Sequence, residues 1–235
     1  MNLFDKLGGI ITGRGLQITF KDRAGAADIL SMMLQTTAKS KKGQQILILG
    51  IPRGGVVIAD VVARKLNANF DIILSRKLRA PDNKENSIGA IMRDGSMYLD
   101  ELKVRWLRVS PDYIEKERAE QLKEIERITA LYRPDNREYI IRDRIIILVD
   151  DGIASGATLI AAARWIRKHQ PERLIVAAPV AQKQATELLK KEADQIEIIA
   201  TPSNNFVSVD QFYQNFEPVG DEHVMDILKK WQYSR

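Results

Sequence analysis

Two adjacent acidic residues and a stretch of small residues follow one strongly apolar segment of the sequence. Asp150 and Asp151 come directly after Ile145–Val149, and glycine, alanine and hydroxyl residues dominate the stretch up to Thr158. Small side chains allow backbone N–H groups to close on a phosphate, and the N-terminus of a following helix adds positive charge. The carboxylates would repel a phosphate beside them, but they accept hydrogen bonds from sugar hydroxyls. The segment therefore predicts a ligand with a phosphate at one end and sugar hydroxyls at the other.

Two further segments carry groups that bind anions. In Pro52-Arg-Gly-Gly55, the guanidinium of Arg53 is a bidentate anion donor, and Gly54 and Gly55 permit unusual backbone angles and close approach. Arg76 and Lys77 follow a predicted strand over Phe70–Leu74, and we expect them at its end. A tight turn with a surface arginine and a basic strand end are the structural alternatives for these two segments.

Several other chemistries lack the residues that they require. The loop after Val149 contains no lysine, so it is not a Walker loop, and Gly13-Arg-Gly15 does not follow the strand that a dinucleotide motif needs. The absence of cysteine excludes thiolate nucleophiles, disulfides and cysteine-based zinc sites. The two histidines, His169 and His223, are too far apart in sequence to form a histidine-rich metal motif.

The elements that must position these residues alternate between strands and helices. The pattern predicts an α/β fold with an open, mostly parallel sheet and helices on both faces, and ligands of such sheets bind at the carboxyl ends of the strands. We expect strands over 45–49, 70–74, 144–149, 174–180 and 196–200, a hairpin over 88–99 that turns at Asp94-Gly95, and helices over 22–39, 56–66, 111–131, 159–169, 184–191 and 221–231.

Composition limits the class of protein. Hydrophobic residues make up 45% of the 235 residues, which is enough for a packed core, and no run of about 18 apolar residues is present to span a membrane. The start of the chain has no secretory signal pattern, so we expect a cytoplasmic protein. The net charge of +5 suits a phosphate-rich ligand. The basic cluster Lys39–Lys42 is too short to form the basic stripe typical of a nucleic-acid-binding surface, so we do not expect a nucleic-acid partner.

The stretch Val149-Asp-Asp-Gly-Ile-Ala-Ser-Gly-Ala-Thr158 resembles the ribose-phosphate signature of type I phosphoribosyltransferases. Further segments resemble a poorly characterised group of predicted phosphoribosyltransferases within that superfamily, and the match covers roughly residues 19–228. These segments are Pro52–Gly55, Arg76–Leu78, Ser87–Ala90 and Phe212–Phe216. The resemblance implies one domain over 1–235, with a core over about 19–200 and a hood with a C-terminal helix over about 201–235.

The resemblance also implies roles for the site residues. Those expected to be catalytic are Asp150, Asp151, Arg76 and Lys77; those expected at the 5′-phosphate are Ala154, Ser155, Gly156, Ala157 and Thr158; those expected at the diphosphate are Arg53, Gly54 and Gly55. The substrate would be the ribose-phosphate diphosphate PRPP. Mg²⁺ would arrive on PRPP and reach Asp150 and Asp151 through water, without direct protein ligands.

The implied reaction is transfer of 5-phosphoribose from PRPP to a nitrogen acceptor, with release of diphosphate. A regulatory protein of the same fold that binds PRPP or a nucleotide without transferring anything is the alternative. The loop over 79–87 resembles a flap in which Lys84 and Glu85 would join the site on closure, and the aromatic residues of the hood would stack on a flat acceptor base. Ala154 replaces the aspartate usual in enzymes for 6-oxopurines, so the acceptor stays open. The resemblance further implies a homodimer.

Overall fold

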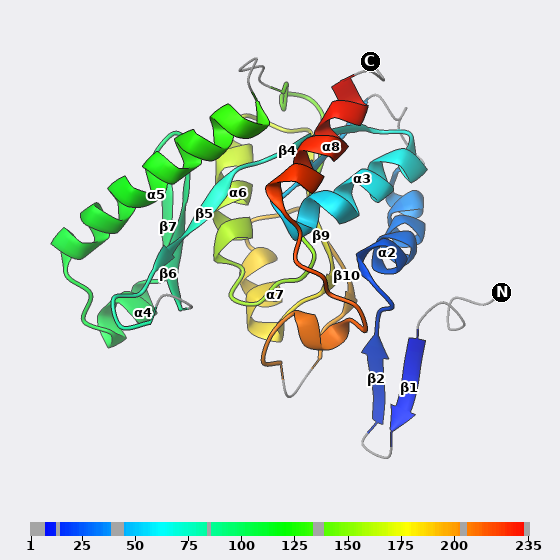
Figure 1. Ribbon diagram of the computed structural model, residues 1–235, viewed down its shortest axis with the longest axis horizontal. Helices are drawn as coiled ribbons and strands as arrows, with labels where there is room; N and C mark the ends of the chain where they lie inside the picture. Colours follow the sequence, from blue (N-terminus) through cyan, green and yellow to red (C-terminus); the bar gives the residue numbers. More distant parts are fainter. Residues whose placement is uncertain are drawn as a thin grey trace.

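The computed structural model describes residues 8–12, 15–38, 45–83, 86–133, 139–202 and 206–232 (Figure 1). The strands are β1 (Gly8–Thr12), β2 (Gly15–Thr19), β3 (Ile46–Gly50), β4 (Asn69–Ile72), β5 (Ser75–Arg79), β6 (Ser87–Met92), β7 (Met97–Leu99), β8 (Ile145–Val149), β9 (Arg173–Val180) and β10 (Gln195–Ala200). The helices are α2 (Arg23–Ala38), α3 (Gly54–Leu66), α4 (Glu101–Trp106), α5 (Pro111–Tyr132), α6 (Ala157–Lys168), α7 (Lys183–Leu189), the 3₁₀ helix η2 (Asp210–Phe212) and α8 (Asp221–Gln232).

The central sheet is parallel throughout and has the strand order β10-β9-β8-β3-β4. Its middle strand β8 consists entirely of buried aliphatic residues, because both faces of the sheet are covered. Ile146 and Leu148 point to one hydrophobic cluster, whereas Ile145, Ile147 and Val149 point to the other. The expected open, mostly parallel α/β sheet is confirmed.

Helices pack on both faces of this sheet, as expected. Leucines 30 and 34 of α2, the apolar side of α3, and Val224 and Ile227 of α8 form the core on one face. Leu159 and Ile160 of α6 and Leu189 of α7 form the core on the other face. In Figure 1, α8 lies across α3 and ends near the C-terminus of the chain.

The prediction for Arg76 and Lys77 was wrong about their element. They do not end the second parallel strand, which stops at Ile72; they lie in β5, the first strand of a separate antiparallel sheet β5-β6-β7. Its burial pattern does not alternate: Ser75 and Leu78 are buried although, three residues apart, they point to opposite faces of the strand, and the two residues between them are charged. The predicted hairpin is confirmed, because β6 and β7 pair antiparallel around Gly95, whose φ is 80°.

The hood packs against the start of the chain. Phe20 forms a bridge with Tyr213, and backbone bonds join Phe20 N to Phe212 O and Gln214 N to Phe20 O, both at 2.8 Å. The flap residues Lys84 and Glu85, the cluster 39–42 and the first half of the linker over 134–143 lie outside the described residues. The helix α4 was not predicted from the sequence. Within the part of the chain that the structure describes, no helix combines the length and the apolar character of a membrane span.

Candidate active site

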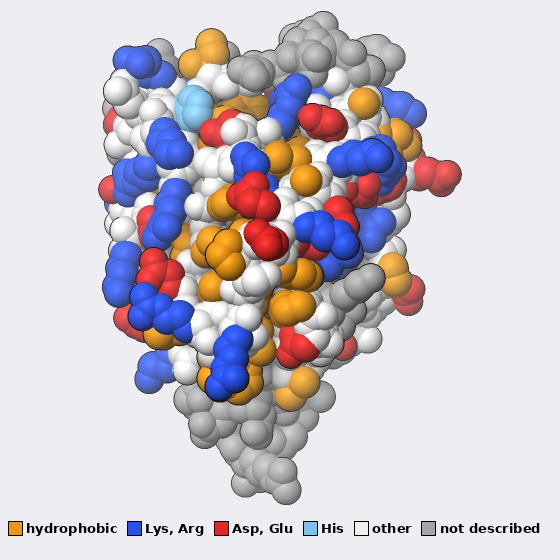
Figure 2. Space-filling model, turned by 90° about the vertical axis from the view of Figure 1, so that its left-hand side faces the viewer, with side chains coloured by type: hydrophobic (Ala, Val, Ile, Leu, Met, Phe, Trp, Pro, Cys, Tyr) orange, Lys and Arg blue, Asp and Glu red, His pale blue; other side chains and the backbone are white. Residues whose placement is uncertain are grey.

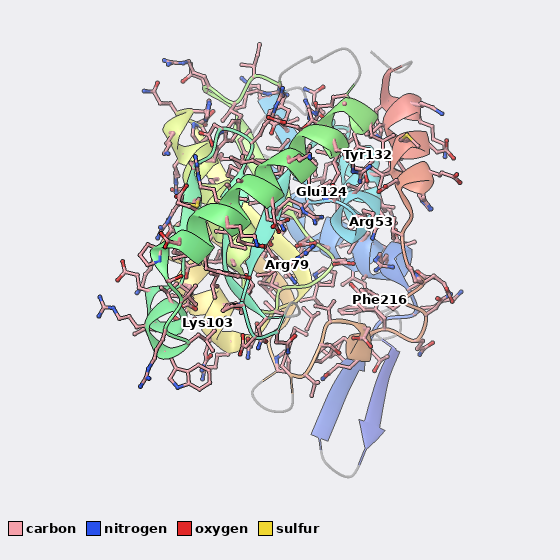
Figure 3. All side chains as sticks on the ribbon, turned by 60° about the vertical axis from the view of Figure 1, so that its left-hand side comes forward. Arg53, Arg79, Lys103, Glu124, Tyr132 and Phe216 are labelled. Carbon is pink, nitrogen blue, oxygen red and sulfur yellow. The ribbon has the colours of Figure 1, made fainter. Side chains whose placement is uncertain are left out.

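The carboxyl ends of β3 and β8 meet β5 at a cavity of about 490 Å³. Most of the predicted site residues line it, although they come from three separate parts of the chain: Arg53, Gly54, Arg76, Lys77, Asp150, Asp151, Ala154, Ser155, Gly156 and Thr158. Gly55 and Ala157 lie buried behind this lining. Residues that were not predicted also line the cavity, and Arg23, Ser75, Arg79 and Val209 are among them. Figure 3 shows Arg53, Arg79 and Phe216 arriving from different elements.

The two acidic residues have different environments. Asp151 accepts a hydrogen bond from Nε of Arg23 through Oδ2 at 2.8 Å, and both side chains are largely buried. Asp150 accepts a bond from the backbone N–H of Asp151 at 2.9 Å. Burial, and then the neighbouring carboxylate of Asp151, raise the pKa of Asp150 well above its usual range. One carboxylate is therefore held as an ion pair, while the other retains its proton at a higher pH than a free aspartate does.

Gly54 and Gly55 are positioned against these acids. A Cβ atom on Gly54 would lie 1.7 Å from Oδ2 of Asp151, and one on Gly55 would lie 2.8 Å from the carbonyl oxygen of Val149. Neither distance is compatible with a side chain, so the loop before α3 interlocks with the end of β8. The sequence located these glycines in the site, but the close neighbour that the structure shows for Gly54 is the carboxylate itself.

The small-residue loop leads directly into α6. Gly156 has a φ of 75° and caps the helix, and α6 begins at Ala157, two residues before the predicted start. Ala154 is exposed, and Ser155 and Thr158 are half-buried. The Ser155 hydroxyl lies 3.5 Å from the backbone nitrogen of Ala157. The N-terminal end of α6, with its unpaired backbone N–H groups and positive dipole, therefore forms the end of the cavity next to the acids.

Basic side chains also line the cavity. Arg53 follows a cis peptide bond to Pro52, and its guanidinium lies 3.7 Å from the carboxylate of Asp221. Arg76 donates from Nε to Gln121 at 3.1 Å, and burial lowers its pKa. Lys77 is exposed, and Arg79 joins the lining from the end of β5. From the sequence, Arg79 was predicted to begin the flap over 79–87.

Arg23 is the functional residue that sequence reasoning missed. Besides Asp151, its guanidinium donates to the carbonyl oxygen of Glu217 at 2.7 Å and lies over the ring of Phe216, 3.7 Å from the ring centroid. Arg23 opens α2, directly after Asp22, which caps the helix through the N–H of Gly25 as predicted. No local pattern could have paired Arg23 with an acid 128 residues away.

The hood aromatics serve mainly as packing. Phe212 and Tyr213 are buried, and the ring of Phe206 lies against that of Phe212 with centroids 5.3 Å apart. Phe216 alone among these four lines the cavity, and it is in contact with both Tyr213 and Arg23. The Tyr213 hydroxyl donates to the backbone carbonyl oxygen of Asp151 at 2.6 Å. The hood is thus bonded to the acidic loop at its backbone as well as through Arg23.

Comparison with known proteins identifies the family. A sequence model described as the phosphoribosyl transferase domain matches residues 19–216, which include the whole cavity lining. This chain belongs to the phosphoribosyl transferase family. Two family members of Mycobacterium tuberculosis are each 33% identical to the chain over 211 residues, which is 90% of this chain and 46% of theirs. They are "Putative phosphoribosyl transferase Rv0571c" of strain H37Rv and "Putative phosphoribosyl transferase MT0597" of strain CDC 1551.

The chain therefore spans about half the length of these curated relatives. Among solved structures, the crystal structure of TT1426 from Thermus thermophilus is 35% identical and superposes with a TM-score of 0.74, covering 91% of this chain and 99% of that one. The fold of TT1426 thus extends over almost all of this sequence.

Proposed function

We propose that this phosphoribosyl transferase moves 5-phosphoribose from PRPP to a nitrogen acceptor and releases diphosphate. One observation carries the proposal: Asp150 and Asp151 line a single cavity together with the N-terminal end of α6 and with basic residues of β5 and of the loop before α3. These three kinds of group suit the three parts of PRPP, which are a phosphate, sugar hydroxyls and a diphosphate.

The small-residue loop is the proposed 5′-phosphate site, and its members are Ala154, Ser155, Gly156, Ala157 and Thr158. Backbone N–H groups at a helix N-terminus bind a phosphate without a cationic side chain. The hydroxyls of Ser155 and Thr158 would donate further hydrogen bonds. The carboxyl groups of Asp151 and Asp150 would accept hydrogen bonds from the ribose hydroxyls and fix the orientation of the sugar.

The diphosphate would lie at the basic end of the cavity. Arg53, Gly54 and Gly55 form the loop that would cradle it, while Arg76 and Lys77 would offset the negative charge that builds on the leaving group. The bond from the anomeric carbon to the diphosphate oxygen breaks as the bond to the acceptor nitrogen forms. The protein contributes position and electrostatic stabilisation to that exchange.

Mg²⁺ fits this arrangement as a companion of PRPP. The described residues contain no group of three potential metal-ligating side chains, whereas the two carboxylates of Asp150 and Asp151 are placed to bind a metal-bound water. Bound to the diphosphate and sugar oxygens, Mg²⁺ would neutralise leaving-group charge. The acceptor would enter beneath the hood, where Arg23, Val209 and Phe216 line the cavity.

The test is release of diphosphate from Mg²⁺-PRPP by the purified chain in the presence of a panel of nucleobases and amines. Asp150→Asn combined with Asp151→Asn should abolish both release and PRPP binding measured by calorimetry, without loss of the folded state by circular dichroism. Asp226→Asn, at an exposed position of α8, is the matched control. Undiminished PRPP affinity in the double variant would refute the role of the acids. PRPP binding without turnover of any acceptor would favour the regulatory alternative.

A further inference from the structure

Ser75 is an unusual residue in this structure. It begins β5 with a relative exposure of 9%, and its Oγ is the one buried side-chain polar atom, among the described residues, that has no hydrogen-bond partner. Buried hydroxyls are almost always paired, since the loss of water is otherwise uncompensated. An orphaned hydroxyl beside a cavity therefore indicates a partner that is supplied by a ligand.

Ser75 lies where two cavities meet. The active-site cavity and a second one of about 330 Å³ share Pro52, Arg53, Ser75 and Arg76. The rest of the second cavity comes mainly from α5, as the positions of Glu124 and Tyr132 show in Figure 3. Ser75 thus stands beside the two arginines at the diphosphate end of the active site.

The charges around this junction favour an anion. Three arginines line the second cavity against two acids. Both acids are already engaged, because Glu124 accepts from Arg127 at 2.9 Å and Asp221 accepts from the Tyr132 hydroxyl at 2.6 Å. The guanidiniums of Arg53 and Arg76 consequently provide the positive potential at Ser75, and a neutral hydroxyl between them would donate its proton to a phosphate oxygen.

We propose that the Ser75 hydroxyl donates a hydrogen bond to the diphosphate group of PRPP, which makes Ser75 a substrate-binding residue. This inference rests on the proposed function. Water does not reach Oγ in the present conformation, so contact requires a neighbouring side chain to move. Arg53 is free to do so: its side chain is 56% exposed, and among the described residues its guanidinium has a single ion pair, at 3.7 Å.

The experiment compares the wild-type chain with Ser75→Ala by calorimetry, using Mg²⁺-PRPP, Mg²⁺-diphosphate and ribose 5-phosphate as separate probes. We expect Ser75→Ala to weaken binding of PRPP and diphosphate about tenfold, as for a hydrogen bond to a charged acceptor, and to leave ribose 5-phosphate unchanged. The melting temperature of the ligand-free variant should equal or exceed that of the wild type, because an unsatisfied buried group is removed. If Ser75 had only a structural role, Ser75→Ala would lower the melting temperature and leave the affinity for PRPP and diphosphate unchanged.

The control is Ser31→Ala in α2, which removes a buried hydroxyl whose bond to the Ala27 carbonyl oxygen is 2.6 Å long. It should leave the affinity for all three probes unchanged. Unchanged PRPP affinity in Ser75→Ala would overturn the proposal, and so would an equal loss for ribose 5-phosphate. Weakened binding of free diphosphate alone would also overturn it, because the anion at Ser75 would then be a separate molecule. If the wild type binds none of the probes, the proposed function itself fails.

Discussion

Nε of Arg23 lies 2.8 Å from Oδ2 of Asp151, and this ion pair joins the first residue of α2 to the acidic loop after β8. The same guanidinium holds the hood through Glu217 and Phe216. Asp151 is thereby fixed in position within the cavity. Arg23 is a positioning residue in this arrangement, and it links the proposed ribose and acceptor ends of the site.

Replacing Arg23 with methionine should leave a largely buried carboxylate without its partner. We expect Arg23→Met to lower the free energy of unfolding by about 1–3 kcal/mol and to weaken PRPP binding. Denaturant unfolding and calorimetry measure the two effects. The control is Arg105→Met, since the pair of Arg105 with Glu101 is about 80% exposed on both sides. That variant should change stability by no more than about 0.5 kcal/mol. Equal losses in the two variants would contradict the positioning role.

Gly54 has no room for a side chain because the Asp151 carboxylate occupies that space. Gly54→Ala should displace the carboxylate and reduce PRPP affinity at least about tenfold, a loss of about 1.4 kcal/mol in binding. Gly25→Ala in α2 is the matched control, because its Cβ would make an ordinary contact at 3.5 Å from Asp22. PRPP titrations of both variants decide the question, and normal binding by Gly54→Ala would show that the carboxylate position is unimportant.

The sequence was most informative where the signal was local. The Asp94-Gly95 turn, the Asp22 cap and the apolar strand before Asp150 each depend on residues a few positions apart, and the structure contains all three. The strand β5 was missed because SRKLR is mostly charged. It is a strand because β6 pairs with it, and Ser75 and Leu78 are buried on opposite faces.

Contacts between distant segments could not be predicted in the same way. Asp151 was identified as a site residue, but its partner Arg23 comes from another helix, and the carbonyl oxygen of Asp151 accepts from Tyr213 in the hood. Each contact depends on how the helices and the hood pack on the sheet. The face seen in Figure 2 has acidic and basic side chains interspersed, in keeping with the mixed charges of the composition. The composition does not tell which acidic side chain pairs with which basic one.

Two buried tyrosine hydroxyls offer a matched comparison. Tyr213 donates to the Asp151 carbonyl oxygen and Tyr132 to the Asp221 carboxylate, both at 2.6 Å. Each Tyr→Phe change removes one such bond and should cost about 1–3 kcal/mol of stability. Tyr213→Phe should weaken PRPP binding more than Tyr132→Phe does, since only Tyr213 contacts the acidic loop. Calorimetry at a temperature where both variants are folded tests this, and equal PRPP affinities in the two variants would exclude a role for the Tyr213 contact.

The raised pKa of Asp150 gives a pH dependence with a definite sign. Burial first, and then the Asp151 carboxylate, favour the protonated form in the folded protein. Over the range between the ordinary aspartate pKa and the raised one, the folded state binds more protons than the unfolded state, so stability falls as pH rises. Asp150→Asn is neutral at every pH and should therefore gain in stability relative to the wild type as pH rises from the ordinary aspartate pKa toward the raised one. Unfolding free energies measured from about pH 4 to about pH 8 check this against Asp226→Asn. A difference between Asp150→Asn and wild type that stays constant with pH would show that Asp150 ionises normally.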